Sequence, residues 1–164
     1  MSWYDAVAFC NKLSEREGLS TVYKINGNNV TAELNTKGYR LPTEAEWEYV
    51  AKGGGASGSL AVNAVYAGSA NLADVAWYSG NSGYRTHPVG QKKPNALGLY
   101  DMAGNVWEWC WDIFGNYPSG SQRDRVFRGG GWDGGVRGLR SANRLNNVPG
   151  NRIHSLGFRL ARRP

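Results

Sequence analysis

The 164-residue sequence has only two cysteines, Cys10 and Cys110, which lie far apart. Two isolated cysteines form at most one bridge, so they cannot supply the disulfide framework that holds many small secreted domains together. Cys10 falls on the apolar face of a predicted helix, where we expect a buried thiol rather than a catalytic one. The fold must therefore depend on its own core, which a chain of this length can build.

Long apolar runs and histidines are also scarce. No run approaches the roughly 20 residues that a membrane-spanning helix needs, and the opening residues MSWY do not resemble a secretory signal. If the protein is exported, we expect the targeting segment upstream of Met1. The two histidines, His87 and His154, are too distant to predict a histidine metal site, and we expect His87 to be structural.

Charged residues make up only 20% of the chain, and the formal net charge is +6. Most arginines stand singly between glycines and apolar residues, whereas nucleic-acid-binding domains usually gather basic residues on one face. An arginine in such a setting commonly donates to backbone carbonyls and carboxylates. We therefore expect no nucleic-acid partner.

What the sequence does have is glycine and aromatic residues: 23 glycines, 7 tryptophans and 9 tyrosines. This composition predicts many tight turns around an aromatic core, with little regular secondary structure. Residues 53–90 in particular predict a long irregular segment, with Tyr84 among the aromatic side chains that pin it.

Two helices are predicted. Residues 2–17 place apolar side chains at helical spacing, and Gly18 is placed to end the helix. The second helix covers 44–52, because Thr43 and Glu46 form a capping box. Glu44, Glu46 and Glu48 could suggest acid–base chemistry, but glutamates in a first turn are the usual complement to the helix dipole.

The strands are predicted to be short. Residues 21–33 indicate a hairpin around Asn26-Gly27, and short strands are expected at 38–42, 125–130 and 156–160, with a polar loop at 115–124. Strict alternation over 106–112 predicts a central strand with Trp107, Trp109 and Trp111 on one side.

A structural calcium ion is a further hypothesis for this region. The side chains of Asn105, Glu108 and Asp112 could offer it oxygen ligands, although no EF-hand spacing accompanies them.

Four blocks of sequence resemble the formylglycine-generating-enzyme (sulfatase-modifying factor) family. They are GYRLPTEAEWE at 38–48, GNVWEW at 104–109, RGG followed by Trp132 at 128–132, and GFR at 157–159. The resemblance implies one domain over residues 1–164 with a C-type-lectin-like α+β fold, consisting of two helices, short antiparallel strands and much irregular structure.

The chemistry of that family does not transfer to this sequence. The family uses two cysteines in its C-terminal segment, and the corresponding places fall near Gly131 and Val136, in a segment (125–164) without cysteine. Without a thiolate there is neither a nucleophile nor a soft metal ligand. Related sulfoxide synthases use a histidine cluster, which two distant histidines cannot form. A formylglycine-generating-like oxidase is the disfavoured alternative, and we predict no catalytic residue, metal ligand or cofactor.

The last forty residues, 125–164, resemble the variable region of proteins diversified by retroelements. In that system asparagine codons are mutated at their adenines, so the products cannot be Lys, Glu, Gln, Met or Trp. Residues 125–162 contain no Lys, Glu, Gln or Met. Asn143, Asn146 and Asn147 look like unmutated template codons.

We therefore predict a variable ligand-binding surface, with Trp132 as a fixed neighbour of the variable positions. The predicted residues are Phe127, Trp132, Asp133, Gly134, Gly135, Leu139, Asn143, Leu145, Asn146, Asn147, Ile153, His154 and Ser155.

The predicted function is non-enzymatic binding or display at the cell surface or outside the cell, with a protein or glycan as ligand. A lectin-like domain of fixed specificity is the remaining alternative. Neither the ligand nor the oligomeric state follows from the sequence.

Overall fold

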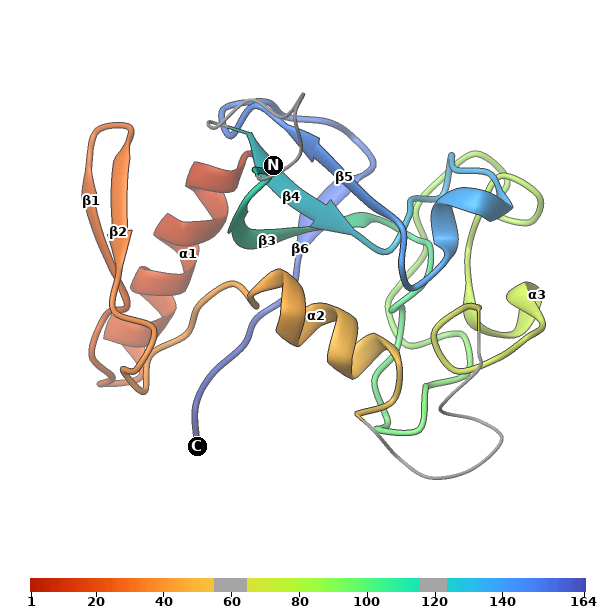
Figure 1. The fold of residues 1–164 in the computed structure, drawn as a ribbon, viewed down its shortest axis with the longest axis horizontal. Coiled ribbons are helices and arrows are strands. Elements are labelled where there is room, and N and C mark those ends of the chain that lie inside the picture. The colour runs from red at the N-terminus through yellow and green to blue at the C-terminus, as the bar shows by residue number, and fades with distance from the viewer. Residues whose placement is uncertain (55–64, 116–123) are drawn as a thin grey trace.

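The computed structural model describes residues 1–54, 65–115 and 124–164. Its regular structure consists of two main helices, one short helix, a separate hairpin and a four-stranded sheet, joined by long irregular segments (Figure 1). The expectation of an α+β fold with much irregular structure is confirmed.

Both predicted helices are present. Helix α1 (Trp3–Arg16) begins after Ser2, whose hydroxyl accepts a hydrogen bond from the Asp5 amide while the Asp5 carboxylate accepts one from the Ser2 amide. Helix α2 (Glu44–Ala51) begins with the predicted reciprocal pair of Thr43 and Glu46. Each capping box satisfies amides that have no acceptor within the helix.

A third helix corrects the expectation of two. Helix α3 (Leu72–Val75) begins at Asn71, whose side-chain oxygen accepts a hydrogen bond from the Ala73 amide. Four residues are too few to show a helical period in sequence. The helix interrupts the segment 53–90 that was predicted to be irregular, of which 55–64 lie outside the described residues.

The predicted hairpin consists of β1 (Tyr23–Asn26) and β2 (Asn29–Ala32). Its turn is Gly27-Asn28, one position later than predicted, because Asn26 pairs with Asn29. Gly27 supplies the positive φ of 55° that the turn requires. The strand expected at 38–42 is reduced to one bridge between Arg40 and Ala161.

The main sheet has the order β5-β4-β3-β6. Strand β3 (Trp107–Ile113) is interior, as predicted, and pairs antiparallel with β4 (Arg125–Arg128), which pairs antiparallel with β5 (Arg144–Asn147). Strand β6 (Leu156–Phe158) pairs parallel with β3, which corrects the expectation of antiparallel pairing alone. The reason is topological: the loop 148–155 carries the chain back across the sheet before β6 begins.

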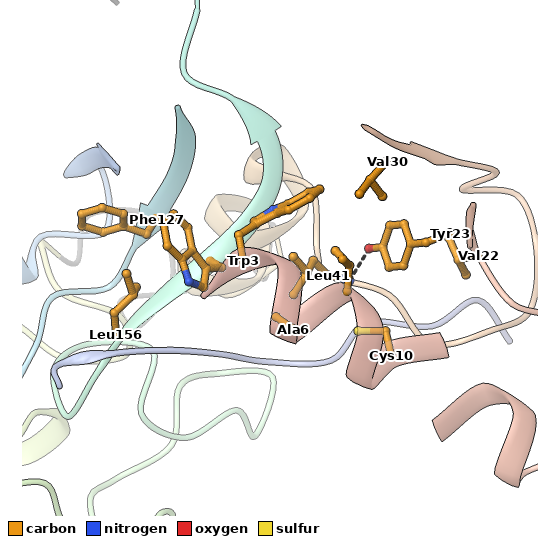
Figure 2. Close-up of a cluster of buried hydrophobic side chains, with 11 residues drawn as sticks. Trp3, Ala6, Cys10, Val22, Tyr23, Val30, Leu41, Phe127 and Leu156 are labelled. Atoms are coloured by element: carbon orange, nitrogen blue, oxygen red, sulfur yellow. Dashed lines mark hydrogen bonds between the residues drawn. The ribbon is translucent and has the colours of Figure 1, made fainter. Parts of the chain in front are cut away.

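Two buried clusters cover opposite faces of this sheet. Trp109 of β3 packs in one cluster with Trp3 of α1 and Phe127, whereas the next residue, Cys110, packs in the other cluster with Trp47 of α2. Figure 2 shows Trp3 and Phe127 in the first cluster. Trp107 and Trp111 join the cluster on the α1 side, so the predicted row of tryptophans is confirmed. Most of the predicted polar loop 115–124, namely 116–123, lies outside the described residues.

Candidate ligand-binding surface

Ion pairs from helix α2 hold the strands that carry the C-terminal region. The fully buried Arg128 of β4 contacts Glu48 through Nη2 and donates from Nη1 to the carbonyl of Asn143 at 2.7 Å. Arg144 of β5 donates two hydrogen bonds to the Glu44 carboxylate, at 2.7 and 2.6 Å. These glutamates therefore act as structural anchors, in agreement with the non-catalytic interpretation of the sequence.

Gly129 and Gly130 turn the chain sharply out of β4. Their φ angles are 96° and 81°, which side chains other than glycine rarely adopt. A Cβ atom on Gly130 would also lie 2.8 Å from Cγ of Leu139. After this pair of glycines and the buried Gly131, residues 132–135 reach the surface.

The backbone of the segment 131–135 is held by residues from outside the C-terminal segment 125–164. The Trp132 amide donates to the Asn105 carbonyl at 2.8 Å, and the hydroxyl of Ser82 donates to the Trp132 carbonyl at 2.9 Å. The Ser79 amide donates to the Gly134 carbonyl at 3.1 Å. These three hydrogen bonds hold the main chain without involving the side chain of Asp133.

Three predicted residues meet at this surface. The rings of Trp132 and His154 have centroids 5.3 Å apart, and Nε2 of His154 lies 3.7 Å from Oδ2 of Asp133. Asp133 and His154 are exposed and Trp132 is partly exposed. Two segments, after β4 and before β6, therefore bring an aromatic ring, a carboxylate and an imidazole together.

The other predicted residues on the surface extend along the edge strand β5 and the loop after it. Leu145 is 44% exposed and stands opposite Phe127, while Asn146 and Asn147 lie further along the strand. Ile153 is partly buried against the α1-side cluster.

The remaining predicted residues of the surface lie before β5. Asn143 donates from its side chain to the Gly138 carbonyl at 3.1 Å, which closes the turn before β5. Gly134 and Gly135 complete the set, and of the two only Gly135 is exposed.

Three of the predicted residues are buried and do not belong to this surface. Phe127 packs edge-on against Trp107 and Trp109, Leu139 is fully buried in the α2-side cluster, and Ser155 is 4% exposed. Their residue types are compatible with mutated asparagine codons, but codon compatibility carries no information on burial. The tertiary contacts decide that these side chains face the core.

Tyr84 is an exposed aromatic residue that the sequence did not assign to the surface. It was expected to pin the irregular segment, yet it is 82% exposed with a φ of 57°. Its amide donates to the hydroxyl of Ser82, which in turn contacts Trp132. A tyrosine within a glycine- and serine-rich loop is the signal that could have indicated it.

His87, by contrast, is structural as expected, since its ring stacks on the Trp77 ring with the two centroids 3.7 Å apart.

Both thiols lie in the core, on opposite faces of the sheet. Burial raises the pKa of Cys10 to about 12 and raises the pKa of Cys110 well above its ordinary value. The reactive form of cysteine is the thiolate, which these environments disfavour. The described residues thus provide no activated sulfur at the C-terminal surface.

The proposed calcium ligands have other partners. Glu108 accepts hydrogen bonds from the Trp47 indole and from Arg159, and Asp112 accepts one from the Glu44 amide. Asn105 bonds the backbone of His87 through both side-chain atoms. Within 1–54, 65–115 and 124–164, no three His, Cys, Asp or Glu side chains converge as a metal site would require. The hypothesis of a calcium ion held by these three residues is therefore not supported.

Among the described helices, none is long and apolar enough to cross a membrane.

The chain is similar to known proteins over most of its length. The chain is 40% identical, over 80% of its length, to a chaperone protein LppX of Paenibacillus barcinonensis. It is 35% identical, over 85% of its length, to a formylglycine-generating enzyme of Streptomyces coelicolor. It spans 57% and 52%, respectively, of the lengths of these two curated relatives.

The structure superimposes on Treponema denticola variable protein 1 with a TM-score of 0.91 and 40% identity, covering 100% of this chain and 70% of that one. The resemblance to a variable protein with a formylglycine-generating-enzyme type of fold is thereby confirmed. The model of the sulfatase-modifying factor enzyme 1-like domain matches residues 1–164. By sequence and by fold, the chain belongs to the sulfatase-modifying factor enzyme 1-like family.

Proposed function

We propose that this chain is a non-enzymatic binding domain whose C-terminal region, 125–164, presents a diversified surface to a protein or glycan ligand. The exposed variable positions are Asp133, Gly135, Leu145 and His154, with the half-buried Ile153, Asn146 and Asn147 beside them and Trp132 as a fixed aromatic neighbour.

The observation that supports this proposal most directly is the separation of backbone from side chains at 131–135. Hydrogen bonds with the Asn105 carbonyl, the Ser82 hydroxyl and the Ser79 amide hold the main chain, while the side chain of Asp133 projects to solvent. Substitution of exposed side chains usually changes stability by less than about 0.5 kcal/mol. A surface of this kind can vary in sequence while its shape persists, and a preordered surface loses little entropy on binding.

The relatives agree with a binding role and do not exclude an enzymatic one, because one is named as a variable protein, one as a chaperone and one as a formylglycine-generating enzyme. The absence of cysteine from residues 125–164 favours binding. The direct check is to incubate the protein with copper and a cysteine-containing sulfatase peptide. We expect no aldehyde product, and measurable turnover would refute the binding proposal.

Diversification is tested by the DNA beside the gene. We expect a near-identical repeat with AAC or AAT at the codons for Asp133, Leu145 and His154, next to a reverse-transcriptase gene. If no such repeat exists, and sister genes differ no more in 125–162 than elsewhere, the domain has a fixed, lectin-like specificity instead.

We also propose that the domain acts at the cell surface. A surface location would give a varying binding site access to external ligands. Protease treatment of intact cells should remove the domain, and protection until the cells are lysed would count against this placement.

A further inference from the structure

A pocket lies at the opposite end of the sheet from Trp132. Strand β4 runs from Arg125, which pairs with Ile113 at the end of β3, to Arg128, which pairs with Glu108 near its start. Trp132 follows β4 at the Arg128 end. A pocket of ≈ 570 Å³ adjoins the Arg125 end, and its lining residues are Tyr4, Asn28, Ile113, Arg125, Val148, Pro149 and Gly150.

The start of helix α1 bonds to two other parts of the chain that line this pocket. The Trp3 amide at the start of α1 donates to the Pro149 carbonyl at 2.9 Å. The Tyr4 hydroxyl donates to the Asn28 carbonyl in the β1–β2 turn at 3.3 Å. The helix start, the hairpin turn and the loop after β5 are therefore held together beside Ile113 and Arg125 before any ligand binds.

Arg125 is the charged residue of this pocket and forms no direct ion pair with a carboxylate among the described residues. Burial lowers the pKa of its guanidinium and has a larger effect than the negative charge of Asp112, which acts to raise that pKa. Its guanidinium carbon lies 3.9 Å above the Trp3 ring and 4.9 Å from the Trp111 ring. Nη1 donates a hydrogen bond to the Trp111 carbonyl at 2.6 Å. By contrast, Arg40, Arg128 and Arg159 each meet a glutamate.

The environment of Arg125 favours an incoming anion. Burial lowers the pKa of its guanidinium, although arginine remains cationic at any physiological pH. The Trp3 and Trp111 rings hold the planar guanidinium in place. The Arg125 side chain therefore loses little conformational entropy when an anion binds to it. A desolvated cation with free N–H donors forms stronger hydrogen bonds to a charged acceptor than to a neutral one.

We propose that this pocket binds a carboxylate attached to an apolar body, with Arg125 as the anion-recognising residue. The guanidinium fork matches the planar carboxylate, and Ile113, Val148 and Pro149 offer apolar surface for the attached group. A single cation balances a single negative charge. A phosphate monoester carries close to two charges at neutral pH, which leaves an uncompensated charge beside these apolar walls.

The pocket is separate from the Trp132 end of the proposed variable surface, which lies at the other end of β4, although Asn147 of that surface pairs with Arg125 and adjoins the Val148 wall. If the pocket does not bind a carboxylate, the proposal for the surface around Asp133 and His154 still stands. If that surface binds no ligand, the proposal for the pocket still stands.

The test uses phenylacetate as the probe, followed by NMR of the ¹⁵N-labelled protein. We expect saturable shifts of the Arg125 Nε–Hε signal and of the Val148 and Gly150 amides. Phenylacetamide, which has the same shape without the charge, should bind at least about tenfold more weakly. Phenyl phosphate should also bind more weakly than phenylacetate. Equal or tighter binding of either comparison compound, or no saturable shift with phenylacetate, would overturn the proposal.

A pair of variants tests the location without disturbing the rings around Arg125. Val148 is 52% exposed, so Val148→Glu and Val148→Gln should both fold, as judged by circular dichroism. The glutamate places a competing carboxylate in the pocket and should weaken phenylacetate binding about tenfold, whereas the glutamine should have a much smaller effect. Equal affinities in the two variants would show that the probe binds elsewhere.

Discussion

Arg159 donates two hydrogen bonds to the carboxylate of Glu108, at 2.5 and 2.7 Å, beside the parallel pair β3–β6. The same carboxylate accepts the indole N–H of Trp47 at 2.6 Å. Glu108 is only 5% exposed. One buried carboxylate thus joins the last strand, the central strand and helix α2.

Glu108→Gln should destabilise the protein, because it leaves the Arg159 charge partly buried without its counter-ion. Removing one member of a buried pair costs about 3–5 kcal/mol, which a urea unfolding curve would detect. Glu33→Gln is the matched control, since Glu33 forms an exposed pair with Lys24 and its loss should leave the unfolding midpoint unchanged. Equal midpoints for the two variants would contradict the structural role of Glu108.

Two glycines of the C-terminal region should respond differently to alanine. Gly130 has a φ of 81° and no room for a Cβ atom, whereas Gly135 has a φ of −83° and no atom within 4 Å of that position. Gly130→Ala should cost more than about 1 kcal/mol, while Gly135→Ala should be neutral or stabilising by up to about 1 kcal/mol. Thermal unfolding distinguishes them, and a reversed order would disprove this assignment of fixed and variable glycines.

Leu139 and Leu145 provide a matched test of which codon-compatible positions face solvent rather than the core. Leu139 is fully buried and Leu145 is 44% exposed. Leu139→Ala should cost about 2–5 kcal/mol through the cavity it leaves, and Leu145→Ala about 0.5 kcal/mol. The comparison requires only denaturant unfolding. Similar losses at both positions would mean that Leu145 is also a core residue.

Acid stability should depend on Glu46. Two hydrogen bonds from Arg40 lower the pKa of this glutamate below its ordinary value, and they outweigh the opposing effect of partial burial. A carboxyl whose folded pKa is depressed stabilises the protein above its unfolded pKa, about 4.3. That contribution is lost as the pH falls through the folded pKa.

Unfolding of the parent protein and of Glu46→Gln, measured from pH 7 to pH 2, should therefore converge at the acid end. A stability difference that stays constant over this range would argue against the contribution of the Arg40–Glu46 pair.

Both cysteines should resist modification in the folded protein. Burial raises the pKa of Cys10 to about 12, and Cys110 lies on the other face of the sheet in an equally closed cluster. Ellman's reagent at pH 8 should titrate neither thiol until guanidinium is added, when both should react. Rapid reaction of either thiol without denaturant would reopen the enzymatic alternative.

Much of the fold was predictable because its signals are local. The Thr43–Glu46 capping box and the apolar spacing of Trp3 to Leu13 set the helices, and the alternation through Trp107, Trp109 and Trp111 identified the interior strand. Helix α3 was missed because one turn of helix has no detectable period. The parallel pairing of β6 was missed because the direction of a strand depends on the path of the loop before it, which has no sequence period.

For the candidate surface, too, some properties follow from the sequence and others only from the tertiary structure. The sequence alone determined which residues are compatible with diversification, because codon chemistry restricts residue type. It also determined that residues 125–164 lack a thiol. Only the tertiary structure decided that Asp133 and His154 meet beside Trp132, that Leu139, Phe127 and Ser155 are buried, and that Arg125 faces a pocket without a direct ion pair to a carboxylate in the described chain. These properties arise from contacts between segments far apart in sequence, and no local pattern records them.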